Sequence, residues 1–172
     1  MIKTLTLKVA ETKPMSYTEQ ELYWDYKNEL WKMTGEQYSD KEVWAWYLDI
    51  LRCETYIIRI IDTLKTPEQI GFVFIGVGEA CPKDADYYIW DCYIEPAYRR
   101  QHIMENTIQD FIKGHTGSYA LYLIDNNEPA VKFWEKQFST LKYKESVLID
   151  ILDIEEEHCK PHKFVYCGEK GD

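Results

Sequence analysis

Short apolar runs that alternate with polar residues, each closed by a turn residue, mark the extended parts of the chain. The first run, residues 2–9, is rich in strand formers and ends before Pro14. Two later runs are joined by a Lys-Thr-Pro-Glu turn in which Pro67 presets one backbone dihedral, and this predicts a hairpin. Altogether the pattern predicts strands at residues 2–9, 55–61, 69–77, 86–94, 118–124, 144–151 and 162–167.

Four other segments repeat apolar residues at helical spacing. Residues 18–21 and 39–42 both have the Ser/Thr-x-x-Glu pattern of a capping box, so a helix is expected from each, and Gly35 ends the first. A third helical pattern begins at Tyr98, and a fourth follows the early-turn Pro129. Each pattern predicts an amphipathic helix with one buried face.

The predicted order of elements is strand, two helices, three strands, helix, strand, helix and two strands. This order is not a regular βαβ winding, so we expect an α/β (α+β) fold in which helices cover a mixed sheet. No internal repeat or low-complexity linker divides the chain, and 172 residues is close to the usual size of one domain. We therefore expect a single domain over residues 1–172.

The formal net charge of −10 narrows the choice of partners. Phosphate backbones select Lys/Arg surfaces, so nucleic acid is not expected, whereas amine-bearing partners are favoured by long-range attraction. The chain has no apolar run long enough to span a bilayer, and its start lacks the apolar stretch of a secretion signal, so we expect a cytoplasmic protein that does not bind membranes. Its five scattered cysteines fit reduced thiols.

One group near the end of the chain combines imidazole and thiolate side chains, which are zinc ligands: His158, Cys159, His162 and Cys167. Their spacing matches no finger pattern. An acidic loop followed by a strand explains the same residues without a metal. We therefore expect no metal site.

Two segments carry the motifs of a known family. Residues 92–104 read Cys-Tyr-Ile-Glu-Pro-Ala-Tyr-Arg-Arg-Gln-His-Ile-Met, and residues 127–136 read Asn-Glu-Pro-Ala-Val-Lys-Phe-Trp-Glu-Lys. Both resemble motifs of the GNAT family of N-acetyltransferases. The resemblance implies a GNAT-like mixed, mostly antiparallel central sheet flanked by about four helices, and it implies an acyl-CoA-dependent N-acyltransferase.

The resemblance also assigns a site for acetyl-CoA, which would be the co-substrate. In the family, the strand before the Pro-x-Tyr-Arg stretch hydrogen-bonds the pantetheine arm through its backbone. The next loop wraps the pyrophosphate, where the start of a helix presents N–H groups to phosphate. By position, the cofactor-binding residues are Cys92, Tyr93 and Ile94 on the strand, Arg99, Arg100, Gln101, His102, Ile103, Met104 and Glu105 on the loop, and Asn127 near the arm.

Three positions depart from the family pattern. His102 and Met104 stand where the loop usually has glycines, which let the backbone approach phosphate closely. Trp134 stands at the usual general-acid tyrosine, but its indole N–H is no practical acid at neutral pH, and a core or pocket-wall role explains it as well. Asp91 and Tyr122 are the candidates for proton transfer, because their strands flank the thioester site of the family.

The sequence supports three functional hypotheses. The first is an N-acetyltransferase that transfers an acetyl group from acetyl-CoA to a primary amine of a small molecule or protein. The alternative is a catalytically degenerate GNAT-fold binding or regulatory module, and the third is an acyltransferase that uses a bulkier acyl or aminoacyl donor. Aromatic residues of the first two helices would wall the acceptor side, unless they pack in the core or in a homodimer contact: Tyr23, Trp24, Trp31, Trp44 and Trp46.

Overall fold

The computed structural model describes residues 1–8, 17–35, 37–64, 66–82, 85–124, 127–140, 146–148 and 159–166. The strands within these residues are β1 (Ile2–Lys8), β2 (Thr55–Asp62), β3 (Glu68–Val77), β4 (Tyr87–Ile94), β5 (Gly117–Ile124), β6 (Ser146–Leu148) and β7 (Cys159–Tyr166). The α-helices are α1 (Tyr17–Thr34), α2 (Asp40–Arg52), α3 (Ile103–Gly114) and α4 (Glu128–Thr140), and η2 (Gly78–Ala80) and η3 (Pro96–Tyr98) are short 3₁₀ helices. The predicted order of strands and α-helices is confirmed.

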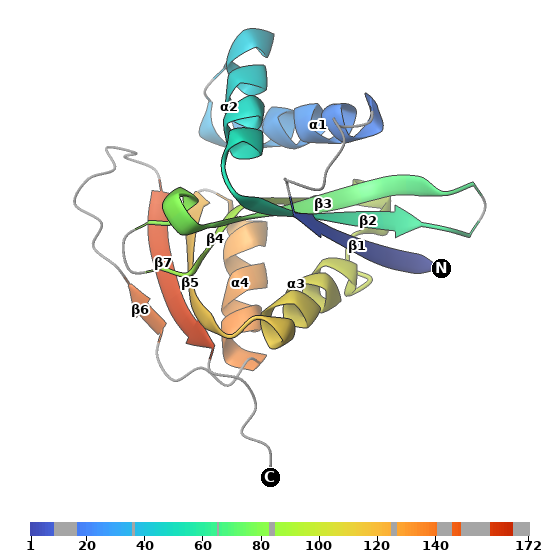
Figure 1. Cartoon of the computed structure of the whole chain (residues 1–172). Coiled ribbons are helices and arrows are strands. Elements are labelled where there is room, and N and C mark those ends of the chain that lie inside the picture. Colours follow the sequence, from blue (N-terminus) through green and yellow to red (C-terminus); the bar gives the residue numbers. More distant parts are fainter. Residues whose placement is uncertain are drawn as a thin grey trace.

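All of the described strands belong to one sheet, in the order β1-β2-β3-β4-β5-β7-β6. Neighbouring strands are antiparallel except β4 and β5, which are parallel. Figure 1 shows α1 and α2 on one side of the sheet and α3 and α4 on the other. The expected α/β fold, a mixed and mostly antiparallel sheet flanked by four helices, is confirmed.

Each face of the sheet has its own hydrophobic core. Alternate residues of a strand point to opposite faces, so neighbouring apolar positions in β2 and β3 serve different cores. Ile57 and Phe74 pack with Tyr23 and other residues of α1 and α2, whereas Ile58 and Ile75 pack with residues of α3 and α4. The central strands are therefore apolar on both faces, and the helices on either side are held at fixed positions relative to them.

The predicted capping boxes differ in outcome. Ser39 precedes α2, and its backbone N–H and hydroxyl both donate to the Glu42 carboxylate at 2.7 Å, as the pattern predicts. The other prediction is wrong, because α1 begins at Tyr17 and Thr18 lies inside the helix. Gly35 does end α1, with a φ of +75° that favours glycine.

The predicted start of the third helix is also wrong. Residues 96–98 form η3, and α3 begins only at Ile103. Arg100 and His102 have φ values of 61° and 59°, and a right-handed helix cannot pass through such residues. A loop therefore replaces the first turn that the apolar spacing from Tyr98 predicts.

The closing strands complete the sheet beyond β5. The predicted runs at residues 144–151 and 162–167 correspond to β6 and β7, and β7 lies between β5 and β6. The side chains of the His158 to Cys167 group lie outside the described residues. Among the residues that are described, no group of His, Cys, Asp or Glu side chains could hold a metal, and no helix has the length and apolar character to cross a membrane. A single domain over the whole chain stays a prediction.

Candidate active site

The parallel strands β4 and β5 separate along their length. They pair through only three residue pairs, from Tyr87 with Tyr119 to Ile89 with Leu121. Both strands continue past this ladder without pairing to each other. The facing backbone N–H and C=O groups of their second halves are thus left for another hydrogen-bonding partner.

A bulge in β4 re-aims the side chains at the point of separation. Phe74 of β3 is opposite Asp91, but the next residue, Ile75, is opposite Ile89, so Trp90 is the extra residue. As a result Trp90 packs with the α1/α2 core and Asp91 contacts α1, although the two residues are adjacent. The bulge therefore turns two consecutive polar-tipped side chains toward the same face of the sheet.

The other end of the β4–β5 pair is fixed by hydrogen bonds between Asp86 and Ser118. The backbone N–H and hydroxyl of Ser118 donate to one Asp86 carboxylate oxygen at 2.8 and 2.7 Å, and the Asp86 N–H donates to the Ser118 carbonyl at 2.9 Å. Gly117 permits this approach, since a Cβ there would lie 2.9 Å from the same carboxylate oxygen. The strands are consequently joined at one end and open at the other.

A cavity with an empty volume of about 460 Å³, counted out to solvent, occupies the open end. Elements from both sides of the sheet line it: α1, the middle of β4, the second half of β5, and the start of α4. The lining residues are Tyr26, Leu30, Ile89, Trp90, Asp91, Cys92, Leu121, Tyr122, Leu123, Ile124, Asn127, Ala130 and Trp134. Most of them are apolar or aromatic, as is usual for small-molecule sites.

Asp91 is the only acidic residue among the described residues that line this cavity. Its side chain is about nine-tenths buried, with 10% of its surface exposed. The Tyr26 hydroxyl donates to Oδ1 at 2.5 Å, and the Lys27 ammonium lies 3.4 and 3.3 Å from Oδ1 and Oδ2. A buried carboxylate with these partners is held in one orientation at the cavity wall.

Burial and the nearby Asp91 charge also keep the Tyr26 phenol and the Cys92 thiol protonated. Burial, and after it the Asp91 charge, raises the pKa of Tyr26 well above its usual value, so the phenol stays protonated and donates. Burial, again followed by Asp91, raises the pKa of the Cys92 thiol to about 12. Cys92 is therefore a neutral thiol near neutral pH rather than a nucleophile.

Tyr122, the other candidate for proton transfer, and Trp134, at the usual general-acid position, line the same cavity. Tyr122 lies half-buried on β5, and its ring meets Tyr88 edge-on with 5.5 Å between centroids. Trp134 of α4 is only 3% exposed and packs in the α3/α4 core. The structure thus brings Asp91, Tyr122 and Trp134 together around one cavity, and their catalytic roles stay predictions.

The strand residues assigned to the cofactor arm occupy the second half of β4. Cys92, Tyr93 and Ile94 pair on one side with β3, while their other edge faces the gap to β5. Cys92 also lines the cavity, whereas the Tyr93 side chain lies on the opposite face, against α1. Apart from the Ile94 carbonyl, which accepts from Arg99, this edge pairs with no neighbouring strand, as the assigned role requires.

Asn127 lies at the start of α4, where it fixes the helix. Its side-chain oxygen accepts the Ala130 N–H at 3.2 Å, and its own N–H donates to the Ile124 carbonyl at 2.9 Å. This is an N-cap arrangement that joins the end of β5 to α4. Asn127 therefore shapes the cavity wall as well as lining it.

Arg99 bridges two elements. Its Nε donates to the Ile94 carbonyl at 3.0 Å, and one terminal nitrogen lies 2.8 Å from both oxygens of Glu29 on α1. Its guanidinium also lies 5.5 Å from the centroid of the Tyr93 ring. These contacts join the end of β4 to α1. The Arg99 guanidinium, which the sequence assigned to phosphate binding, is therefore already paired with Glu29.

The loop keeps the backbone conformation of its missing glycine. His102 has a φ of 59°, the left-handed region that glycine adopts without strain and other residues at a cost of about 1 kcal/mol. Its Nδ1 lies 2.6 Å from the Glu105 carboxylate, to which Lys136 of α4 also donates at 2.9 Å. His102, and then Lys136, lowers the pKa of Glu105 below its usual value.

The remaining loop residues divide between solvent and core. The Gln101 side chain donates to the Ala97 carbonyl at 3.1 Å, and Arg100 is exposed. Met104 packs against the α3/α4 core. The first helical hydrogen bond of α3 runs from the Asn106 N–H to the His102 carbonyl. The N–H groups of residues 103–105 precede it and can face an anion.

Sequence reasoning did not identify three contributors to the site, of which the first is Tyr26, the donor to Asp91. Lys27 pairs with Asp91, and Lys136 pairs with Glu105, in both cases from a helix remote in sequence. The available signal for Lys27 was its position in an aromatic helix, one turn after Tyr23. No comparable signal marks Lys136.

Comparison with known families agrees with this geometry. Residues 20–139 match the sequence profile of the family described as Acetyltransferase (GNAT) family. That match covers well over half of the chain, so the protein belongs to the GNAT acetyltransferase family. No curated protein sequence matches the chain significantly.

Solved structures with a similar fold cover almost the whole chain. An acetyltransferase from Thermus thermophilus has a TM-score of 0.62 and 11% identity, covering 94% of this chain and 95% of its own. Arabidopsis thaliana NAA60 in complex with acetyl-CoA has a TM-score of 0.55 and 15% identity, covering 96% and 98%. A ribosomal-protein alanine N-acetyltransferase from Escherichia coli has a TM-score of 0.55 and 12% identity, covering 100% and 99%. At such identities the likeness shows the fold.

Proposed function

We propose that this protein is a cytoplasmic N-acetyltransferase that transfers the acetyl group of acetyl-CoA to an amine of a small molecule or protein. The observation that carries the proposal is the separation of β4 from β5, with a cavity at the opening and the buried Asp91 carboxylate on its wall. The family supplies the general reaction, acyl transfer from a CoA thioester. The acceptor class and the choice of an acetyl donor are part of the proposal.

Several residues are suited to hold acetyl-CoA, which brings an activated acyl group as a thioester. The free edge of residues 92–94 offers backbone groups to an extended arm, and the first turn of α3 offers N–H groups and the positive end of its dipole to phosphate. Arg100 adds an exposed positive charge beside that turn. The Glu105 charge at the same place is compensated by Lys136, and the His102 ring hydrogen-bonds the same carboxylate oxygen.

Asp91 is proposed as the group that receives the proton of the acceptor amine. A carboxylate at the wall of the cavity can accept a proton as the amine attacks, and Tyr26 keeps it oriented. Tyr122, on the facing strand, is proposed as the donor to the departing thiolate. Trp134 then serves as a cavity wall, which its 3% exposure and packing favour.

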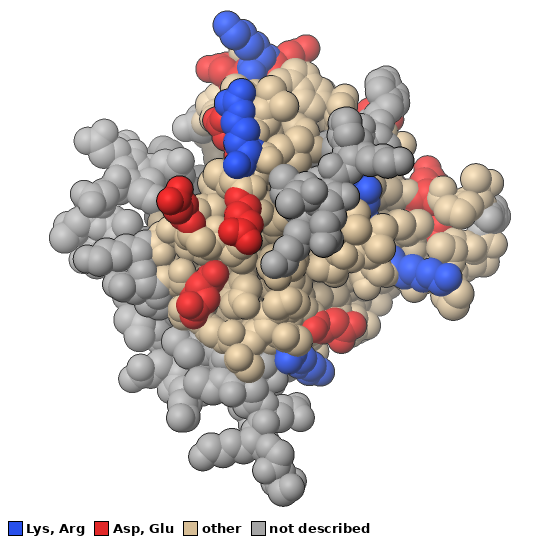
Figure 2. Space-filling view, in the orientation of Figure 1, with Lys and Arg blue, Asp and Glu red and all other residues tan. Residues whose placement is uncertain are grey.

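The surface charge is compatible with an amine-bearing acceptor. Figure 2 shows acidic side chains on the face below α2, with Lys and Arg scattered among uncharged surface. An acidic field raises the encounter rate with cationic molecules. A net charge of −10 acts in the same direction.

A catalytically degenerate binding or regulatory module is the second candidate. The contacts of Asp91 favour it, because both carboxylate oxygens already have partners in Tyr26 and Lys27. The buried tryptophan at position 134 favours it too. A bulkier acyl donor is the remaining variant of the enzymatic proposal.

The discriminating experiment measures the release of CoA thiol by the purified protein from acetyl-CoA and from a bulkier acyl-CoA, with a broad panel of amines. Amine-dependent release from acetyl-CoA supports the proposed function. Release only from the bulkier thioester would identify that acyl-CoA, rather than acetyl-CoA, as the donor. Release from neither, by folded protein, contradicts the enzymatic proposal and favours the binding module.

Filling the cavity should lower the activity strongly. Ala130 lies half-buried on α4 and lines the cavity, so Ala130→Phe places a ring in the space between β5 and α4. We expect at least about a tenfold loss of kcat/KM for acetyl-CoA, because a small displacement of bound reactants is costly. Steady-state thiol release measures the loss.

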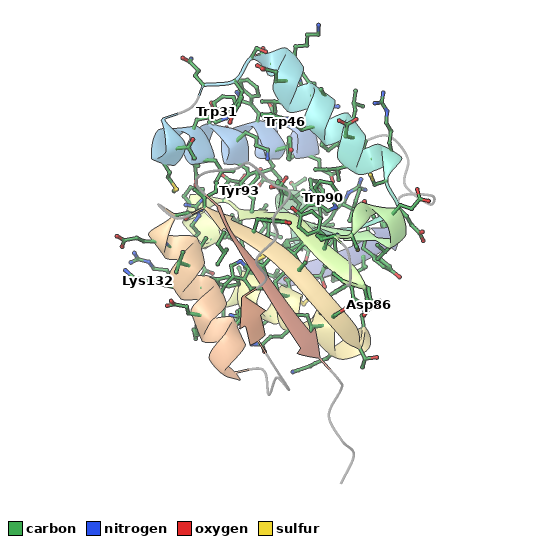
Figure 3. All side chains as sticks on the ribbon, turned by 90° about the vertical axis from the view of Figure 1, so that its left-hand side faces the viewer. Trp31, Trp46, Asp86, Trp90, Tyr93 and Lys132 are labelled. Carbon is green, nitrogen blue, oxygen red and sulfur yellow. The ribbon has the colours of Figure 1, made fainter. Side chains whose placement is uncertain are left out.

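Lys132→Phe is the matched control on the same helix. The Lys132 side chain is 74% exposed and points away from the sheet (Figure 3). This variant should keep kcat/KM within about twofold, as expected for an exposed position away from the site. Equal activity of the two variants would place the acyl donor elsewhere.

A further inference from the structure

Lys27 is a cation enclosed by aromatic rings beside the cavity. Its ammonium lies 5.1, 4.9 and 5.7 Å from the ring centroids of Tyr23, Tyr26 and Trp46. Its side chain is only 14% exposed, and its ion pair with Asp91 is 3.3 Å long. Rings at such distances stabilise a desolvated cation through their quadrupoles. The place next to Asp91 is therefore already filled by a positive charge.

Among the described residues that line the cavity, this arrangement leaves no carboxylate oxygen without a partner to pair with another cation. Both Asp91 oxygens are engaged, by Tyr26 and by Lys27. Glu29, a nearby acid on α1, is held by Arg99. A second ammonium group on an acceptor would thus lose its hydration without gaining a partner, and it would be repelled by Lys27.

Aromatic rings lie both on the cavity wall and beside Lys27: Trp90 lines the cavity, and the Trp46 ring faces the Lys27 ammonium. Beyond Lys27, Trp46 meets Tyr38 with 4.7 Å between centroids, and Tyr38 meets Trp31 at 5.8 Å. Figure 3 shows Trp31 and Trp46 in the helical layer and Trp90 and Tyr93 on the sheet beneath it. Trp46 is 38% exposed, so part of this aromatic surface remains open to solvent. Such partly exposed rings stack readily on an aromatic ligand.

We propose that the acceptor carries a single amino group on an uncharged aromatic body, and that Lys27 sets this preference by occupying the place that a second ammonium group would take. The proposal rests on the proposed function, whose acceptor class it narrows. Polyamines and other polycationic acceptors are disfavoured by the same contacts, despite the acidic surface. Lys27 repels a group that stays charged, whereas Asp91 takes a proton only from the reacting amine, which attacks in its neutral form.

The test compares benzylamine with para-xylylenediamine, which is benzylamine with a second aminomethyl group. In the wild type, kcat/KM for benzylamine should exceed that for the diamine by about tenfold, the ratio produced by one uncompensated charge at a partly buried site. Lys27→Met and Lys27→Gln should both reverse this preference, because they free Asp91 to pair with the second ammonium group. Lys27→Arg, which keeps the charge, should retain the wild-type preference.

Two features keep the test decisive. The ratio of the two kcat/KM values is unaffected by a general loss of folded protein or of turnover. A local packing defect would not be the same in Lys27→Met and Lys27→Gln, so a change shared by both is due to the lost charge. Equilibrium binding of the two amines in the presence of CoA gives the same ratio without turnover, so a failure of catalysis is distinguished from a failure of this inference. A wild-type preference for the diamine, or a ratio that is unchanged in both neutral variants, would overturn it.

Discussion

Asp91→Asn is expected to lower kcat by about a hundredfold, the lower part of the range for loss of a general base. The amide keeps the shape of the side chain, and its oxygen can still accept the hydrogen bond from the Tyr26 hydroxyl. It cannot take a proton from the acceptor amine. Affinity for acetyl-CoA should be unchanged, because the arm and phosphate contacts proposed for residues 92–94 and 100–105 do not involve this side chain. Single-turnover thiol release separates the chemical step from binding.

Asp110→Asn is the control for Asp91→Asn. Asp110 is exposed on α3, so its amide variant tests the loss of one negative charge from the protein without a change in the cavity. This control should retain kcat within about twofold, as for most surface substitutions. A full rate for Asp91→Asn would assign the proton transfer to another group, and Tyr122→Phe would then be the next variant.

Arg59→Met is expected to lower the free energy of unfolding by about 3 kcal/mol, the usual effect of removing one partner of a buried ion pair. Glu19 of α1 is fully buried, and the Arg59 guanidinium of β2 binds its Oε2 with distances of 2.8 and 2.9 Å. This pair holds α1, and with it Tyr26 and Lys27, against the sheet. Denaturant unfolding with an unchanged m-value measures the loss.

The effect of Arg59→Met should also depend on pH. Burial raises the pKa of Glu19 above its ordinary 4.5, although Arg59 lowers it. Without Arg59 the folded-state pKa rises further, so the variant is least destabilised below the unfolded pKa, where Glu19 is protonated in both states. Stability is then lost as the pH rises through the folded pKa. A loss that grows toward acid would contradict this assignment.

Arg52→Met provides the control for the ion pair. The Arg52 and Asp49 side chains of α2 are 75% and 59% exposed, and their nitrogen and oxygen are 3.0 Å apart. Exposed pairs contribute little, so this variant should lose less than about 1 kcal/mol. Similar losses for both arginines would show that burial does not govern the contribution of the Glu19 pair.

Local patterns in the sequence predict most of the fold. The β2–β3 hairpin follows from two apolar runs and the Pro67 turn, and α2 follows from its capping box. The start of α3 was wrong because apolar spacing from Tyr98 does not reveal that Arg100 and His102 adopt positive φ. Such conformations in residues other than glycine depend on contacts with the rest of the protein.

The candidate site was only partly predictable. The motifs place Asp91, Tyr122 and Trp134 near one another, and the structure shows that they line one cavity. The contacts of Tyr26 and Lys27 with Asp91 span about 65 residues of sequence, and local periodicity carries no information on such contacts. The bulge at Trp90 is likewise invisible in the alternation, although it decides which way Asp91 points.

Titration calorimetry with acetyl-CoA tests the central claim most directly, with CoA and a bulkier acyl-CoA as controls. We expect micromolar binding of acetyl-CoA to the wild type, much weaker binding to Ala130→Phe, and unchanged binding to Lys132→Phe. That result would place the thioester in the gap between β4 and β5 and show that the loop binds phosphate with His102 in the glycine position. An absence of binding to every thioester, by protein shown to be folded, would contradict the claim.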